Sequence, residues 1–383
     1  MTTATAAGVP AKQITDEDVS YIKSFIGKSA VVVQWNEEAS TDSIRHYAWG
    51  IGDENPLWLS DSYAQTTRYG TRIAPPTFLY SVCDAEVAMG MSEGIQAIHL
   101  GADLDLRRPI RLGERVRARA FVEDVRERVG RRSGRLVEQV GRTDYFVGEE
   151  LVGIVRNTIV CVARSSEGQR MHEPRDPHVY TDDEKEQIRA AILAEEIRGQ
   201  RTRSAETVSV GDLVPQVVKG PLDLITMTAY YAGAIGTAGY RGVETRVRQQ
   251  ERVRNGDPSA PTNLGPEHFL SEPFPSLGHQ DAAMAHAIGM PGAYDNGNQR
   301  VSWMAHCVTN WMGDDADLVS LSVRIKQPGV FGDTQWIGGE VTRVFRDEDH
   351  GACAEVTMKA INQLGVETTS AVAVVSLAET RSS

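Results

Sequence analysis

The strongest constraint on the fold of this chain is an internal repeat, which shows in residue spacing rather than in identity. Trp58 precedes Pro75 by 17 residues, and His279 precedes Asn296 by the same 17. The segment RPIRLGE follows the first pair much as QPGVFGD follows the second. Two copies of one structural unit are therefore predicted to be fused in a single chain.

The first copy begins with helical patterns and ends with a run of strands, and in the second copy one strand precedes the helices and the final run of strands. Valine or isoleucine recurs with β-type spacing in several segments of each copy, and glycine or charged residues separate these segments. Helices followed by antiparallel strands define an α+β class and not the βαβ alternation of a nucleotide-binding sheet. The predicted strands are 98–106, 114–126, 135–147 and 151–163 in the first copy, and 208–218, 318–327, 334–346, 351–363 and 366–378 in the second. The main predicted helices are Thr77–Met89, 222–235 and about 298–312, with a surface loop at 249–259.

Length and composition fit two domains. A chain of 383 residues with 41% hydrophobic residues is longer than one typical domain and can bury two cores. We expect an N-terminal domain at 15–165, a linker at 166–204 and a C-terminal domain at 205–380. Within the linker, Thr181–Glu184 has a capping-box pattern, which predicts the start of a helix.

Charge and hydropathy exclude several classes of protein. The net charge of -12 disfavours a nucleic-acid binder or an anionic-membrane binder. No apolar run approaches the roughly 20 residues of a membrane span, and the first residues lack the basic and apolar regions of a signal peptide, so a cytoplasmic location is expected. The four cysteines lie far apart without a C-x-x-C pair, so we expect buried thiols, no metal site and no cofactor.

Short motifs occur in the same order in both copies. The first copy contains Asp53–Leu57 (DENPL), Ile73–Pro76 (IAPP) and an Arg-Pro-x-x-x-Gly-Glu segment, and the second contains Gly278–Asp281 (GHQD) and Tyr294–Arg300 (YDNGNQR). These motifs resemble the MaoC-like, hydratase-2 group of acyl-CoA hydratases and dehydratases. The first copy is similar to the N-terminal dehydratase domain of that group, which is also found in fatty acid synthases. The resemblance implies a double hotdog, in which each half is a central helix wrapped by an antiparallel β-sheet and an acyl chain enters between the halves.

Hydration of a 2-enoyl thioester, or the reverse dehydration, needs two kinds of group. An acid or base must move the proton at Cα and handle the water at Cβ, and donors must stabilise the enolate oxygen. The resemblance implies that an Asp-x-Asn-Pro-x-His loop supplies the first and that a backbone amide at the start of the central helix supplies the second. Asp53 and Asn55 match this loop, but Trp58 stands at the His position and cannot take a proton. His279 matches the His in the second copy, where Phe274 stands at the Asp position.

The amides at the helix start favour a site in the second copy. Pro75 and Pro76 have no amide hydrogen, whereas Asn296 and Gly297 keep theirs. We therefore expect His279 to act as the base or acid, with Asn296 and Gly297 as oxyanion donors.

The remaining candidate residues carry supporting roles. Asp53 and Asn55 belong either to a degenerate site or to the same cleft, reached across the pseudo-twofold axis. His306 lies inside an apolar helical pattern and is expected to be structural, and His279 by itself would also suit a helix cap. Four further residues are expected to border the cleft: Asp281 and Asp295 as orienting carboxylates, Arg300 as a ligand for a phosphate or carboxylate, and Trp58 as a wall.

The leading hypothesis is a hydro-lyase of fatty-acid or lipid metabolism that acts on a CoA-bound or carrier-bound 3-hydroxyacyl or 2-enoyl thioester. A hotdog acyl-CoA thioesterase is the alternative from another enzyme class. The split Asp and His pair also permits a non-catalytic acyl-binding subunit of a heteromeric dehydratase. The expected partners are the thioester and either a second copy of the chain or a small hotdog chain, with no nucleic acid and no membrane.

Overall fold

The described residues form one large antiparallel sheet that holds the strands of both copies. The computed structural model describes residues 13–30, 32, 34–83, 85–91, 95–130, 134–163, 172–235, 242–257 and 275–378. In these ranges ten strands pair in the order β1-β3-β4-β5-β2-β7-β10-β9-β8-β6. The strands are β1 (Ser29–Ala30), β2 (Ile95–Leu106), β3 (Val116–Gly130), β4 (Gly134–Val147), β5 (Glu150–Ala163), β6 (Leu213–Lys219), β7 (Asp317–Ile325), β8 (Gln335–Asp347), β9 (Gly351–Asn362) and β10 (Glu367–Ser376).

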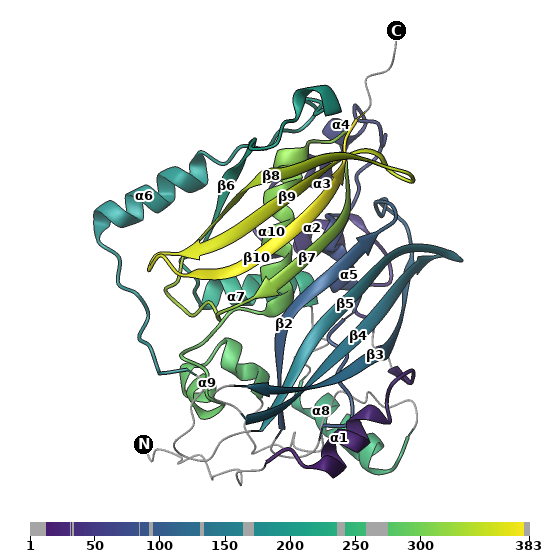
Figure 1. The fold of residues 1–383 in the computed structure, drawn as a ribbon, viewed down its shortest axis with the longest axis vertical. Helices are drawn as coiled ribbons and strands as arrows, with labels where there is room; N and C mark the ends of the chain where they lie inside the picture. Colours follow the sequence, from purple (N-terminus) through teal and green to yellow (C-terminus); the bar gives the residue numbers. More distant parts are fainter. Residues whose placement is uncertain are drawn as a thin grey trace.

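The two half-sheets meet where β2 pairs with β7, and these strands lie side by side in Figure 1. The register runs from Gly101 opposite Arg324 to Asp105 opposite Ser320. Gly101 is required at this contact, because a Cβ there would lie 2.1 Å from the carbonyl oxygen of Val323. Backbone pairing thus makes the two halves one continuous sheet.

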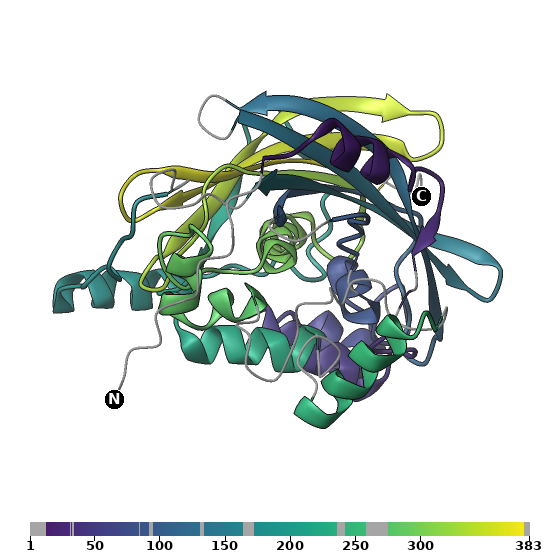
Figure 2. The same cartoon turned by 90° about the horizontal axis from the view of Figure 1, so that it is seen from below.

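The long helix α10 (Gly297–Met312) lies on the concave side of the sheet. Every residue from Asn298 to Met312 is buried, as expected for a helix that is covered on all sides. Figure 2 shows the sheet curving over α10, with α2 (Thr41–Gly50) and α7 (Leu224–Tyr230) on the other side of that helix. The central helix under the sheet therefore belongs to the second half.

The corresponding helix of the first half is much shorter than predicted. Instead of a helix over 77–89, the chain forms a 3-10 turn at Pro76–Phe78 and one turn of helix, α5 (Leu79–Val82), before Cys83 becomes extended. The backbone amides of Trp35 and Asn36 donate to the carbonyls of Val82 and Ser81, at 2.7 and 3.3 Å. Those carbonyls would otherwise accept from amides one turn further along, so the helix ends there.

Other predicted elements are close to those observed. The strand predictions are confirmed to within a few residues at most ends, and α6 begins at Asp182, directly after the predicted cap Thr181. The loop predicted at 249–259 is wrong for its first part, which continues a helix, and its last two residues lie outside the described residues. The remaining helices are α1 (Asp16–Lys23), α3 (Pro56–Leu59), α4 (Asp61–Ala64), α6 (Asp182–Leu193), a π-helix at Tyr231–Ile235, α8 (Val243–Arg254) and α9 (Ala282–Ala287).

Within these ranges, the helices are too short or too polar to cross a membrane. All four cysteines are buried and free, as predicted.

Candidate active site

The first-half loop holds its aspartate out of solvent. Asp53 follows the end of α2 and is 1% exposed. Its Oδ1 accepts the backbone amide of Asn55 at 3.0 Å, and its Oδ2 accepts the indole Nε1 of Trp58 at 3.0 Å. The Asn55 side chain in turn caps α3 by accepting the amide of Leu57 at 3.0 Å. Both carboxylate oxygens of Asp53 are therefore engaged by its own loop.

Asp53 also meets a histidine of the second half, but that histidine is His306 and not His279. The Nε2 of His306 lies 3.6 Å from Asp53 and 2.9 Å from Glu195, and its Nδ1 lies 2.7 Å from the Nζ of Lys219. Lys219 Nζ also donates to two backbone carbonyls in the turn that precedes Asp53. Burial lowers the pKa of Lys219 to about 8, although Glu195 and Asp53 act in the opposite direction. A buried polar network thus joins the first half, the linker and the second half.

His306, which the apolar helical pattern predicts to be structural, has a fully buried imidazole in this network. The only local signal for the contact was a histidine inside an otherwise apolar helix. Nothing in the sequence near Asp53 indicated which histidine it would meet, because the two residues are brought together by the packing of α10 against the first half.

A cavity of about 150 Å³ lies beside this loop, between the two halves. Asn55 and Trp58 line it, whereas Asp53 does not, so the indole of Trp58 stands between the carboxylate and the cavity. Pro75 and Pro76 line the same cavity and bring no amide hydrogen to it. Apolar side chains of both halves form most of its other walls, among them Leu57, Leu79, Ile110, Met312 and Leu318.

The second-half loop presents His279 as a neutral base. His279 ends the 3-10 turn Pro275–His279, and its Nδ1 lies 2.9 Å from the carbonyl oxygen of Tyr294. Because a carbonyl can only accept, Nδ1 carries the proton and Nε2 keeps its lone pair. Burial lowers the pKa of His279 to about 4, against the opposing effect of the Tyr294 and Asp295 carbonyls. The ring packs against Tyr294 and Tyr231, with centroid distances of 4.1 and 6.2 Å.

The start of α10 follows three residues after Tyr294. Asn296 caps the helix by accepting the amide of Asn298 at 2.9 Å, and the hydroxyl of Tyr230 donates to the same side-chain oxygen at 3.4 Å. Within the described ranges the amide of Gly297 donates no hydrogen bond, so it can serve a ligand oxygen. His99 of the first half packs directly on Gly297: a Cβ added there would lie 1.9 Å from the Nδ1 of His99.

The other predicted carboxylates have structural partners. Asp281 is exposed and caps α9 by accepting the amide of Met284 at 2.7 Å. Asp295 accepts from the Nε of Arg300 at 2.7 Å and from the amide of Gly329 at 3.1 Å. Arg300 is 1% exposed, and its Nη1 donates to Thr369 at 2.6 Å, so its guanidinium is used inside the fold.

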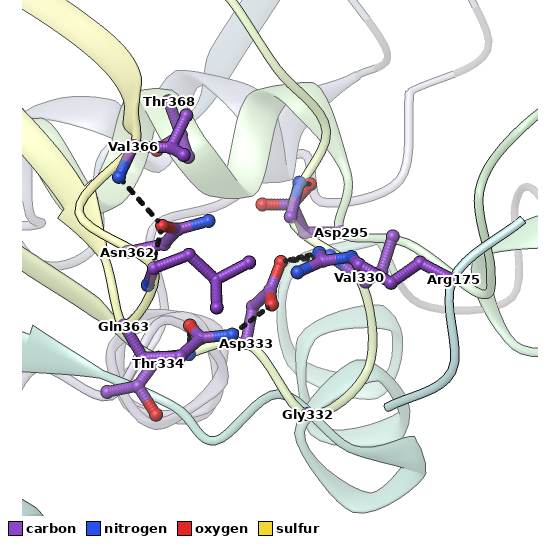
Figure 3. Close-up of polar contacts among 12 residues, drawn as sticks. Arg175, Asp295, Val330, Gly332, Asp333, Thr334, Asn362, Gln363, Val366 and Thr368 are labelled. Carbon is purple, nitrogen blue, oxygen red and sulfur yellow. Dashed lines mark hydrogen bonds and ion pairs between the residues drawn. The ribbon is translucent and has the colours of Figure 1, made fainter. Parts of the chain in front are cut away.

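A second carboxylate, Asp333, fixes the turn that Asp295 binds. Figure 3 shows Arg175 of the linker and Gln363 reaching Asp333 from opposite sides, at 2.5 and 2.6 Å. Asp333 also accepts the amide of Val330 at 3.0 Å. The loop that carries Tyr294 and its contact to His279 is therefore held by two buried carboxylates. The described residues contain no group of three or more His, Cys, Asp or Glu side chains placed to hold a metal ion.

Comparisons with known proteins connect the first half to a dehydratase family. Residues 24–149 match the family model of the FAS1-like dehydratase domain region. A UPF0336 protein of Streptomyces avermitilis is 26% identical over 151 residues, which cover 38% of this chain and 96% of that protein. A 3-hydroxybutyryl-CoA dehydratase of Methylorubrum extorquens is 30% identical over 89 residues, which cover 23% of this chain and 56% of that enzyme.

Solved structures resemble nearly the whole chain. A protein described as a MaoC-like dehydratase has a TM-score of 0.61 at 18% identity, with 93% of this chain and 100% of that chain covered. A conserved hypothetical protein of Mycobacterium tuberculosis, described as having a double hotdog fold, has a TM-score of 0.54 at 10% identity, with 95% and 99% covered. At these identities the likeness shows the fold, and the predicted α+β double hotdog is confirmed.

Proposed function

Because this chain is a double-hotdog protein with a MaoC-like fold and a FAS1-like dehydratase region at residues 24–149, we propose that it is a hydro-lyase acting on an acyl thioester. The substrate class is a 2-enoyl or 3-hydroxyacyl group carried by CoA or by a carrier protein. The 3-hydroxybutyryl-CoA dehydratase among its relatives supports this class of reaction.

The observation that carries the proposal is the pairing of His279 with the start of α10. A neutral imidazole whose Nδ1 is bonded to a carbonyl offers Nε2 as a proton acceptor at neutral pH. Three residues after Tyr294, the Gly297 amide sits at the positive end of a 16-residue helix. A base and an oxyanion donor are the two groups that the chemistry needs.

In the dehydration direction, His279 Nε2 takes the proton from Cα while the thioester oxygen gains negative charge. The Gly297 N–H stabilises that charge, and the α10 dipole adds to the effect. The Cβ–O bond then breaks, and the leaving hydroxyl takes up a proton from an acid group or from solvent and departs as water. In the hydration direction the same groups act in reverse, with His279 returning a proton to Cα.

The first-half loop is assigned a supporting role in this proposal. Trp58 replaces the proton-accepting residue of the loop and covers Asp53, which lies beside His306 and Lys219 in the buried network. The cavity next to Trp58 has acyl-compatible walls, but no titratable group of the loop faces it.

The proposal is tested by following the absorbance of enoyl thioesters with purified protein and a panel of short, long and ring-bearing acyl groups. His279→Ala is expected to lower kcat by about 100-fold or more, because general acid–base groups typically contribute that much. His46→Ala is the matched control, since His46 lies exposed on α2.

Three outcomes would contradict the proposal. Wild-type protein that turns over none of the panel refutes a hydro-lyase. Release of free thiol without a change in enoyl absorbance identifies a thioesterase instead. A chain that is inactive alone and co-purifies with a small hotdog protein is a non-catalytic subunit.

A further inference from the structure

A carboxyl group of the first half lies near the start of α10. In the second-half loop the position of the motif aspartate is taken by Phe274, which lies outside the described residues. One proton moves at Cα and another at the water, so a second acid–base group beside His279 would assist hydration and dehydration. Asp281 and Asp295 are committed to a helix cap and to Arg300, so neither supplies it.

Glu86 reaches this region through His99. The Oε1 of Glu86 lies 3.4 Å from the Nδ1 of His99, and the His99 ring packs on Gly297. His99 Nε2 lies 2.9 Å from the carbonyl oxygen of Gly101, so Nε2 carries the proton and Nδ1 is turned toward the carboxyl group. His279 and His99 therefore border the same short turn, the first through Tyr294 and the second through Gly297.

The degree of burial of Glu86 and His99 suits proton exchange between the carboxyl group and solvent. The His99 side chain is 5% exposed and is fixed in place, whereas Glu86 keeps 28% of its side-chain surface exposed. Burial raises the pKa of Glu86 to about 7. A carboxyl group of this kind is present in both protonation states near neutral pH, and it can exchange its proton with solvent.

We propose that Glu86 is the second acid–base group of the site, and that His99 is the residue that positions it across the two halves. This inference rests on the proposed hydro-lyase function. It also gives the first half a direct part in catalysis, although its own Asp-x-Asn-Pro loop lacks a histidine.

The proton balance of the step is complete. In dehydration, the Cα–H bond breaks and its proton goes to His279 Nε2, while the electron pair forms the Cα–Cβ double bond. The Cβ–O bond breaks, and the hydroxyl leaves as water with the proton of the Glu86 carboxyl group. The enzyme resets when His279 loses its proton to solvent and Glu86 regains one. Hydration runs the same transfers backwards.

The expected pH profile has two limbs. His279 sets the acid limb and Glu86 the alkaline limb, so kcat/KM should be bell-shaped between pH values of about 4 and about 7. The other titratable and charged groups that border the turn are His99, Tyr230, Tyr231, Tyr294, Asp295 and Arg300. Glu86→Gln removes the titration but keeps the shape of the neutral carboxyl group, and it is expected to lower kcat by about 100-fold and to abolish the alkaline limb.

Three further variants complete the experiment. Glu149→Gln is the matched control, because Glu149 is an exposed glutamate of the same half that pairs with a surface arginine. Glu86→Asp keeps a carboxyl group on a shorter side chain, so it should retain the alkaline limb with a lower kcat. His99→Leu should shift the alkaline limb with little change in KM, because the carboxyl group loses the polar neighbour that lies 3.4 Å from it.

The outcomes separate the two proposals. If wild type is active, His279→Ala is inactive and Glu86→Gln matches Glu149→Gln in kcat and in its alkaline limb, the role of Glu86 is refuted and the hydro-lyase stands. If wild type is inactive on the whole panel, the hydro-lyase itself fails and this inference fails with it. Should Glu86→Gln not fold by circular dichroism, Glu86→Asp decides: an unchanged kcat overturns the inference.

Discussion

The buried pair of Arg300 and Asp295 is expected to fix the loop that holds His279, and Arg300→Met tests this. The two side chains are 1% and 7% exposed, and Arg300 also donates to Thr369. Methionine preserves most of the hydrocarbon, so little cavity results. The variant instead leaves a buried carboxylate without its cation, which costs about 3–5 kcal/mol in proteins. We expect the free energy of unfolding to fall by that amount.

The assay is urea unfolding followed by tryptophan fluorescence and circular dichroism. The double variant Arg300→Met/Asp295→Asn removes the stranded charge, so its loss should be smaller than the sum of the two single losses by about 1 kcal/mol or more. Arg254→Met is the control, because Arg254 pairs with Glu251 on the exposed surface of α8 and such pairs contribute less than about 1 kcal/mol.

The pH dependence gives a second check on the same pair. Burial raises the pKa of Asp295 and Arg300 opposes this, so removing Arg300 should raise that pKa further. A carboxyl group with a raised folded pKa contributes stability below its unfolded pKa, near 3.9, and this is lost as pH rises through the folded pKa. The deficit of Arg300→Met should therefore be largest at neutral pH and shrink toward pH 4. A deficit below about 1 kcal/mol at pH 7, or one independent of pH, would refute the reasoning.

Three other predictions concern the two loops. The folded pKa of His279, about 4, lies below its unfolded value of 6.5, so the unfolded state takes up a proton first as the pH falls. The free energy of unfolding should therefore fall by about 3 kcal/mol between pH 6.5 and pH 4. Thermal melts recorded across that range should show no such loss for His279→Gln. Gly297→Ala places a methyl group against His99, so it should lower the free energy of unfolding in urea by about 1–3 kcal/mol and should also lower kcat. A variant with wild-type kcat and wild-type stability would contradict the packing described. Asp53→Asn removes one charge from the buried network and should cost about 1–3 kcal/mol, with kcat within about threefold of wild type, whereas a loss of turnover without a loss of stability would place Asp53 in the chemistry.

Local sequence patterns determined the class of fold. The alternation of apolar residues located β2 to β5 and β7 to β10, because one face of each strand must be apolar to cover the helices. The capping box at Thr181 located the start of α6, since that pattern satisfies helix amides by itself. The repeat of motifs predicted two copies, and the pairing of β2 with β7 shows how they join.

Only the tertiary structure decided which polar groups meet. The first-half helix stops at Val82 because a distant segment takes the carbonyls that would have continued it. Asp53 meets His306 and Lys219, and Glu86 meets the start of α10 through His99, although these residues are far apart in the sequence. The amino-acid sequence thus specified a double hotdog and the candidate base His279. The partners of each titratable group depend on long-range packing across the two halves, which no local periodicity encodes.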